Sequence, residues 1–153
     1  MNTRKKDDYM YEPLSSDDKS INDDAYFQLL KQLKPYETVS PIYDFPYYYI
    51  TSHGRVFSTL FNKLRRLSTS LVGHGYEYLN ILLFGVRQGY YVHRLVAEHF
   101  IDNPDGKPHI NHKNGDKTCN HIQNLEWVTR SENIQHAIHI LGKHVGRPKK
   151  NNN

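Results

Sequence analysis

The pattern of apolar and polar positions divides the chain into a short helical start and a longer strand-rich part. Between residues 26 and 33 apolar side chains recur at helical spacing and Pro35 ends the pattern, which predicts one amphipathic helix. Residues 36–47 are rich in proline and tyrosine and are expected to form a linker. Aromatic and β-branched runs then predict strands at 48–50, 55–58 and 79–83, with turns at 51–54 and 85–89 and a basic loop at 63–66.

The last third of the chain predicts the order helix, strand, loop, strand, helix. The expected segments are a helix that begins near residue 93, strands at 110–112 and 125–128, and a polar loop at 113–120 between them. Thr129 and Glu132 have the spacing of a capping box, in which each side chain accepts a hydrogen bond from the other residue's backbone amide. A second helix should therefore begin there and end near Gly142. The predicted fold class is α+β.

Charge is distributed unevenly along the 153 residues, whose formal net charge is +4. Residues 1–40 hold six basic and eight acidic side chains, whereas residues 41–153 hold fourteen and eight. All ten histidines lie in the second part, eight of them between His93 and His144. Such a segment favours a polyanionic partner through phosphate contacts, although a solvated surface accounts for the charge equally well.

Several classes of protein are excluded by composition. One cysteine rules out a disulfide framework and a zinc site of four cysteines. No apolar run approaches the roughly 18 residues needed to span a bilayer, and the basic N-terminus lacks the apolar stretch of a secretory signal. Residues 1–20 are polar and are expected to be disordered. We expect a soluble, intracellular protein that binds no membrane.

Four polar side chains stand where the predicted strands and last helix begin or end. Asn111 and His112 end the first strand, Asn124 precedes the second, and Asn133 lies in the first exposed turn of the helix. A strand pair packed on a helix can bring the strand end and the helix start together. Amide oxygens could then hold a hard divalent cation and a neutral imidazole could deprotonate water, although an Asn-His pair is ordinarily a simple polar turn.

The same residues carry a resemblance to a known family. HRLVAEHF at 93–100, INHKNGDK at 110–117 and NLEWVT at 124–129 resemble the HNH endonucleases of phage and intron-homing type, over roughly residues 90–140. Upstream, YITSHGRVFS at 49–58 resembles the small nuclease-associated modular domain that often precedes this unit. The resemblance implies a small β-rich module followed by a ββα-metal (His-Me finger) unit, which hydrolyses a DNA phosphodiester with one divalent cation, Mg²⁺ or Mn²⁺.

The resemblance also implies a role for each of the four side chains. His112 corresponds to the general base that activates water, and Asn111 and Asn133 correspond to the metal ligands. Asn124 corresponds to the asparagine that braces the loop and helps to orient the histidine. With asparagine at both ligand positions we expect a site without fixed negative charge, in which bound phosphate supplies much of the anionic coordination.

Double-stranded DNA is the partner that this interpretation implies, with no small-molecule cofactor. The expected DNA contacts are basic: Arg55, Arg65, Arg66, Arg94, Lys113 and Arg147. Arg147 lies in a GRPKK segment that resembles an AT-hook core, although a basic tail is the commoner origin of such a segment. The expected organisation is an arm at 1–40, a DNA-contacting module at 41–91, the nuclease unit at 92–142 and a tail at 143–153.

Two other functions fit the sequence. The chain could be a DNA-binding protein with a catalytically decayed HNH fold, or a protein-interaction module whose basic charge is incidental. The sequence indicates neither the target site nor the oligomeric state.

Overall fold

The structure is a computed structural model that describes residues 19–43, 45–83, 85–140 and 142. Within these ranges it has three α-helices and three antiparallel sheets, which confirms the predicted α+β class. The helices are α1 (Lys19–Lys31), α2 (Val92–Phe100) and α3 (Arg130–His139). Residues 1–18 and the predicted basic tail at 143–153 lie outside the described residues. Lys19 and Ser20 belong to α1, so the expectation of disorder up to residue 20 is wrong for these two.

The first sheet has the strand order β1 (Val39–Pro41), β2 (Tyr48–Thr51), β3 (Val56–Ser58) and β4 (Arg65–Arg66). The prediction of β2, β3 and the turn between them is confirmed. The linker prediction for 36–47 is wrong in part, because β1 lies within it and ends in a proline that an edge strand tolerates. The loop prediction for 63–66 is also wrong in part, because Arg65 and Arg66 pair with β3. β1 and β4 lack the aromatic or β-branched run that predicted β2 and β3.

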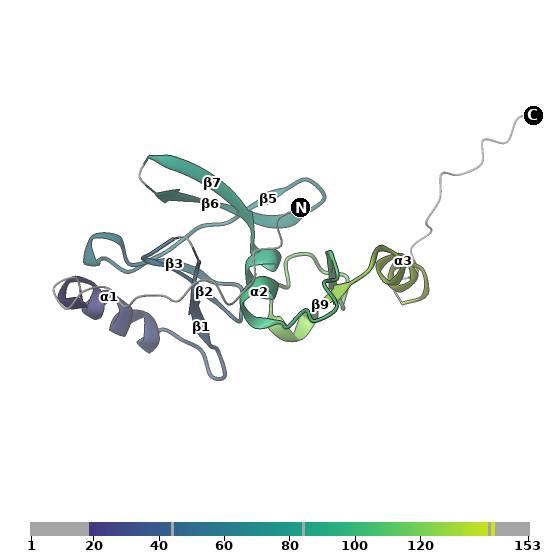
Figure 1. Cartoon of the computed structure of the whole chain (residues 1–153), viewed down its shortest axis with the longest axis horizontal. Coiled ribbons are helices and arrows are strands. Elements are labelled where there is room, and N and C mark those ends of the chain that lie inside the picture. Colours follow the sequence, from purple (N-terminus) through teal and green to yellow (C-terminus); the bar gives the residue numbers. More distant parts are fainter. Residues whose placement is uncertain (1–18, 44, 84, 141, 143–153) are drawn as a thin grey trace, which may run out of the picture.

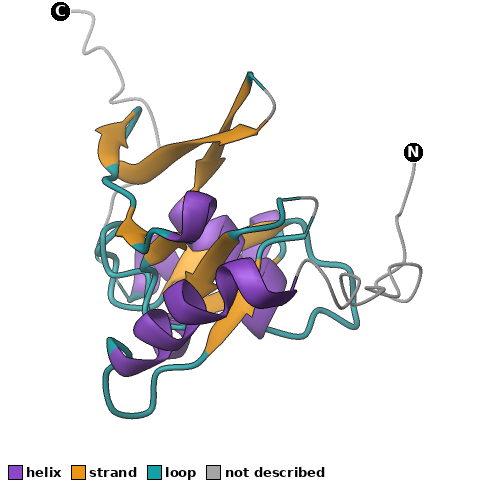
Figure 2. Cartoon of the chain, turned by 90° about the vertical axis from the view of Figure 1, so that its left-hand side faces the viewer, coloured by secondary structure: helices purple, strands orange, loops and turns teal. Residues whose placement is uncertain are grey.

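The second sheet has the order β5 (Ser70–Val72), β6 (Tyr76–Leu83) and β7 (Val86–Tyr91). Its long β6–β7 hairpin extends beyond the core at the top of Figure 1 and Figure 2. The predicted turn at 85–89 is wrong in length, since β7 already begins at Val86. Gly89 belongs to β7, where it pairs with Asn80, and the Tyr78 ring lies over it: a Cβ there would lie 1.5 Å from the Tyr78 hydroxyl oxygen.

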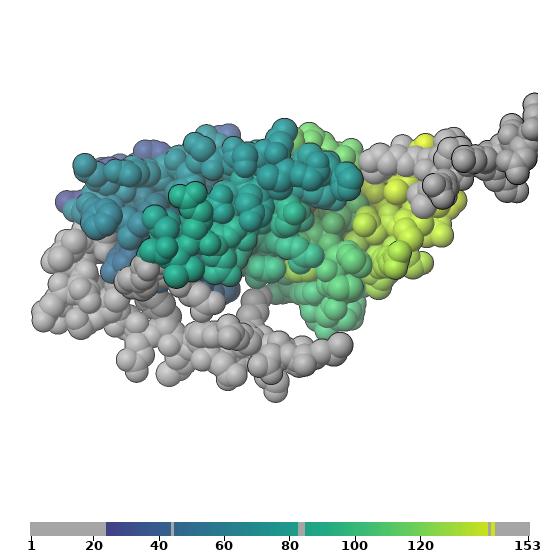
Figure 3. All heavy atoms as spheres, turned by 90° about the horizontal axis from the view of Figure 1, so that it is seen from above, coloured from purple at the N-terminus to yellow at the C-terminus, as the bar shows by residue number. Residues whose placement is uncertain are grey.

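The third sheet is the ribbon of β8 (His109–His112) and β9 (Leu125–Val128), with a short 3-10 turn η2 (Ile122–Asn124) before β9. Both strands and the helix after them agree with the prediction. The capping box at Thr129 and Glu132 is present, and it starts α3. α3 forms the end of the molecule opposite α1 (Figures 1 and 3).

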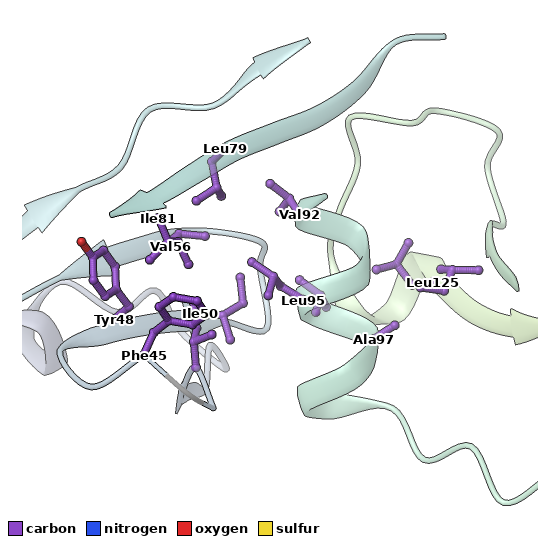
Figure 4. Packing of buried hydrophobic residues seen from close by; sticks show 13 residues of the cluster. Phe45, Tyr48, Ile50, Val56, Leu79, Ile81, Val92, Leu95, Ala97 and Leu125 are labelled. Carbon is purple, nitrogen blue, oxygen red and sulfur yellow. The ribbon is translucent and has the colours of Figure 1, made fainter. Parts of the chain in front are cut away.

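The hydrophobic core lies around α2, which packs against strands of all three sheets (Figure 1). Leu95 points toward Ile50 of β2, and Leu125 of β9 points toward the opposite side of the helix (Figure 4). Val92, Leu95, Val96 and Ala97 are all at most 2% exposed. The core therefore joins the strand-rich half of the chain to the β8–β9 ribbon.

A buried ion pair fastens the first sheet to the end of α1. The Arg55 side chain donates from Nε to Glu37 Oε1 (2.9 Å), from Nη2 to Glu37 Oε2, and from Nη2 to the Gln32 carbonyl oxygen (2.8 Å). The Glu37 side chain is fully buried. Burial alone would raise the pKa of Glu37, but hydrogen bonds from Arg55, Thr51 and the Lys34 amide outweigh it and lower the pKa to about 2.

Glu37→Gln should destabilise the fold at neutral pH by about 3 kcal/mol, because Arg55 then keeps a buried charge without its counter-ion. The folded pKa lies below the ordinary value of 4.5, so the ionised Glu37 stabilises the parent above that pH, and the contribution is lost as the pH falls toward about 2. Urea unfolding across this interval measures the effect. Asp24→Asn, which removes an exposed carboxylate, is the control; equal stability of parent and Glu37→Gln at neutral pH would contradict the prediction.

Candidate active site

The β8–β9 ribbon presents two different faces at the end of β8. Successive residues of a strand point to opposite sides, and the register pairs His112 with Leu125 and Asn111 with Glu126. Leu125 belongs to the core around α2, so His112 lies on the α2 side. Asn111 lies on the other side, and α3 packs against both strands. The proposed base and the proposed ligand are consecutive residues with Cα atoms about 3.8 Å apart, and their side chains point to opposite sides of the ribbon.

His112 is buried, with 5% of its surface exposed. Its Nε2 atom lies 3.2 Å from Asn120 Oδ1, an oxygen that can only accept, so Nε2 carries the proton and Nδ1 keeps its lone pair. Its ring meets the His93 ring edge to face at 5.2 Å and lies 6.0 Å from the Tyr76 ring. Burial lowers the pKa of His112, although the hydrogen bond to Asn120 opposes this. The imidazole is therefore neutral at neutral pH, as a general base requires.

His93 of α2 adds no positive charge beside His112. Burial, followed by the proximity of His112 and Arg94, lowers the pKa of His93 to about 4. Its Nδ1 atom is buried and has no hydrogen-bond partner in the described part of the chain. His93 therefore acts as a neutral packing surface for the His112 ring.

Asn124 holds the loop between the two strands. Its amide nitrogen donates to the Cys119 carbonyl oxygen (2.8 Å) and to Asn114 Oδ1 (3.0 Å), and its Oδ1 accepts from the Asn114 amide (3.0 Å). Its own carbonyl oxygen accepts from the Lys113 amide (2.8 Å). This geometry agrees with a bracing role. The side chain that forms a hydrogen bond with the His112 ring is Asn120, which no sequence pattern indicated because it lies in an irregular loop. The role of Asn124 in orienting His112 stays a prediction.

Asn111 has an acidic partner across the ribbon. Its Nδ2 donates to Glu126 Oε1 at 2.7 Å, which leaves its Oδ1 as the atom that could meet a cation. The expectation of a site without fixed negative charge is therefore wrong, because Glu126 adjoins Asn111. Asn111 and Glu126 are 15 residues apart, a separation that follows neither helix nor strand periodicity, so the sequence did not indicate that Glu126 adjoins Asn111.

Asn133 lies on the face of α3 that is turned toward the end of β8. His136, one turn later on the same face, has its Nε2 3.0 Å from the carbonyl oxygen of Lys113, the residue directly after His112. Asn133 is half-buried and its backbone amide bonds Thr129. The structure thus brings the helix start to the strand end that carries Asn111 and His112.

The described residues contain no cluster of three or more His, Cys, Asp or Glu side chains that could hold a metal ion. A cation here would need amide oxygens as ligands. Asn111, Asn133 and Glu126 offer oxygen donors, the kind that a hard divalent cation and not zinc prefers. The roles of Asn111 and Asn133 as ligands stay a prediction.

The six basic side chains expected at DNA fall into three groups. Arg65 and Arg66 on β4, Arg94 on α2 and Lys113 after β8 are exposed; Arg55 is committed to Glu37 and Gln32; and Arg147 lies outside the described residues. Arg66 also lines a polar groove of about 310 Å³ together with Ser68, Thr69 and Glu77. DNA contact at the four exposed positions stays a prediction.

No helix among residues 19–43, 45–83, 85–140 and 142 is long and apolar enough to cross a membrane.

Comparison with known proteins assigns a family to part of this region. Residues 90–135 match the sequence model HNH_3, described as HNH endonuclease. This segment contains α2, the β8–β9 ribbon and the first half of α3. It does not reach residues 49–58, so the resemblance of that stretch to a nuclease-associated modular domain stays a prediction.

Three relatives illustrate the similarity. The chain is 41% identical over 91 residues to the uncharacterized HNH endonuclease L245 of Acanthamoeba polyphaga mimivirus, which covers 60% of this chain and 27% of that protein. It is 42% identical over 108 residues to YosQ of Bacillus subtilis, a prophage protein named for HNH homing endonucleases, covering 69% of this chain and 60% of YosQ. It is 30% identical over 92 residues to the DNA endonuclease I-HmuI of Bacillus phage SP01, covering 60% and 52%.

A solved structure that describes DNA binding and cleavage by the HNH homing endonuclease I-HmuI superposes on this chain with a TM-score of 0.62 at 28% identity. The superposition covers 71% of this chain and 62% of I-HmuI, so the likeness extends beyond residues 90–135. In sequence the chain spans between 27% and 60% of the length of these three relatives.

Proposed function

We propose that this chain is an HNH-type DNA endonuclease that hydrolyses a phosphodiester bond with the help of one divalent cation. The observation that carries the proposal is the state of His112: a buried, neutral imidazole whose Nε2 is held by Asn120, next to Asn111 at a strand end. The match of residues 90–135 to the HNH endonuclease family and the likeness to I-HmuI support it independently.

In the proposed reaction, His112 accepts a proton at Nδ1 from a water molecule whose oxygen attacks phosphorus. The P–O3′ bond breaks as the new P–O bond forms, and the 3′-oxygen leaves and takes a proton from solvent. His112 then returns its proton to solvent. A bound divalent cation would stabilise the charge that builds on the phosphate and on the leaving oxygen.

The chain's own groups for that cation are Asn111, Asn133 and the Glu126 carboxylate. Asparagine at both expected ligand positions favours the alternative of a catalytically decayed DNA-binding protein. Glu126 argues against it, because this carboxylate supplies the negative charge that the amides lack, at 2.7 Å from Asn111 Nδ2.

His112→Gln should abolish plasmid nicking while DNA binding persists, because the amide cannot take the proton from water. A loss of roughly 100-fold or more is expected, the usual contribution of a general base. Supercoiled plasmid incubated with Mg²⁺ or Mn²⁺, with an EDTA arm, measures nicking, and a gel shift in EDTA measures binding. His139→Gln, an exposed histidine at the end of α3, is the control. Parental nicking by His112→Gln would refute the assignment, and no nicking by the parent would favour the decayed form.

Glu126→Gln should lower the affinity of the protein for Mn²⁺, because it removes the fixed charge beside Asn111. Asn111→Asp should have the opposite effect on metal affinity. It places a second carboxylate against Glu126, so without metal it should lower the melting temperature, and added Mn²⁺ should raise the melting temperature by more than in the parent. Thermal melting with and without Mn²⁺ tests both variants. Asp105→Asn, an exposed acid outside the ribbon, is the control. Identical Mn²⁺ responses of parent, Glu126→Gln and Asn111→Asp would remove this region from the cation site.

Arg65→Ala combined with Arg66→Ala should weaken binding to all DNA sequences alike, because phosphate contacts position a protein without choosing sequence. The salt dependence of the affinity should flatten by roughly 1–2 in slope for two lost contacts. Lys31→Ala with Lys34→Ala removes the same charge from exposed positions around the end of α1 and is the control. A salt slope equal to that of the parent would mean that β4 does not touch DNA.

A further inference from the structure

We propose that Glu77 of β6 is a positioning residue for His112, and that it acts through the side chain of Asn120. Glu77 lies outside the segment that matches the HNH endonuclease family, in the second sheet. The catalytic meaning of this inference rests on the proposed function, whereas the effect on the state of the His112 ring does not.

The contacts form a continuous chain from β6 to the His112 ring. Asn120 Nδ2 donates to Glu77 Oε2 at 2.7 Å, and Asn120 Oδ1 lies 3.2 Å from His112 Nε2. The other carboxylate oxygen of Glu77 accepts from the Thr69 hydroxyl at 3.2 Å. Asn120 is 3% exposed, so water is largely excluded from the amide that joins Glu77 to His112.

The chemistry of these groups makes the arrangement directional. An amide offers a donor on one atom and an acceptor on the other, whereas a carboxylate only accepts. Glu77 therefore attracts the Asn120 nitrogen at 2.7 Å and turns the oxygen toward His112, and the Thr118 carbonyl oxygen accepts from the same nitrogen at a longer 3.3 Å. With the amide reversed, an N–H group would face Nε2, and the neutral ring would have to carry its proton on Nδ1. Glu77 thus selects the tautomer in which Nδ1 is free to act as a base.

Packing holds Asn120 within reach of Glu77. Gly54 has a φ of +77°, and a Cβ there would lie 2.8 Å from the Asn120 Cβ, so the backbone of the turn before β3 packs closely against this side chain. Lys117 fastens the loop that carries Asn120 to the β5–β6 hairpin, whose second strand carries Glu77: its Nζ donates to the His74 carbonyl oxygen at 2.8 Å and lies 4.6 Å from the Tyr76 ring centroid. Glu77 is also the one acidic residue in the sequence from 48 to 91, a stretch with five basic residues.

The direct test is the tautomer of His112, read from its imidazole ¹⁵N shifts in the full-length labelled protein at mildly alkaline pH, without DNA or metal. We expect Nε2–H in the parent and in Glu77→Gln, which keeps an acceptor oxygen, and a shift toward Nδ1–H in Glu77→Ala. Lys117→Met removes another contact between the loop and the hairpin without touching Asn120, and should leave the tautomer unchanged. Retention of Nε2–H by a folded Glu77→Ala would overturn the inference.

Plasmid nicking gives the second measurement. Glu77→Ala should lower kcat by roughly 10- to 100-fold, as loss of an orienting partner typically does, with KM for DNA nearly unchanged. A rise in KM with unchanged kcat would contradict a positioning role. If the parent does not nick DNA, the proposed function fails while the tautomer measurement still decides the inference.

A reciprocal exchange covers the case in which Glu77→Ala does not fold. Asn120→Asp alone sets two carboxylates against each other. Combined with Glu77→Gln it restores one donor and one acceptor, since the amide introduced at position 77 can donate to the new carboxylate, which still accepts from His112. The double variant should exceed Asn120→Asp in kcat by roughly tenfold and show the Nε2–H tautomer, because the carboxylate at position 120 can only accept from the ring. A double variant no better than Asn120→Asp would overturn the inference.

Discussion

The three small sheets of the described residues meet on α2, which contributes side chains to one core shared by all of them. A two-stranded ribbon such as β8–β9 is at best marginally stable in isolation. Here Ile110 and Leu125 of that ribbon share one core with Ile50 of β2 and Ile81 of β6, through side chains of α2. The orientation of the His112 strand therefore depends on this core, so substitutions in distant strands can disturb the candidate site through packing alone.

Burial also determines the chemistry available to His112. A charged imidazole is disfavoured in this environment, because burial lowers the pKa of both His112 and His93 and keeps them neutral near pH 7. The same environment strengthens hydrogen bonds and makes an unpaired polar group costly. Asn120 and Asn111 are each bonded to a carboxylate, Glu77 and Glu126 respectively. The side-chain amides of Asn111, at the end of β8, and of Asn120, in the loop that follows, thus each have an acidic partner.

The sequence predicted those elements whose signal is local. The ribbon and α3 could be predicted because β-branched runs, a polar loop and a capping box occur in order within residues 110–132. β1 and β4 could not, because β1 ends in a proline and β4 is a pair of arginines, so neither has the aromatic or β-branched run that predicted β2 and β3. The pairs Glu37–Arg55, Glu77–Asn120 and Asn111–Glu126 join residues 18, 43 and 15 apart, and only the folded topology brings such positions together. For this reason the sequence predicts a DNA contact for Arg55 and gives no sign that its guanidinium bonds Glu37 and Gln32.

The division into a module at 41–91 and a nuclease unit at 92–142 stays a prediction, yet bonds cross it close to the candidate site. The Ile122 amide donates to the Ser52 carbonyl oxygen at 2.8 Å, Lys117 bonds the His74 carbonyl oxygen, and Asn120 bonds Glu77. Each of these contacts holds the loop between β8 and β9, which carries the hydrogen-bond partner of His112. Hydrogen bonds therefore cross the predicted boundary between residues 91 and 92. Glu77 and Asn120 thus connect β6 to the His112 ring across the predicted boundary, so the half proposed to bind DNA and the proposed catalytic histidine are joined by these hydrogen bonds.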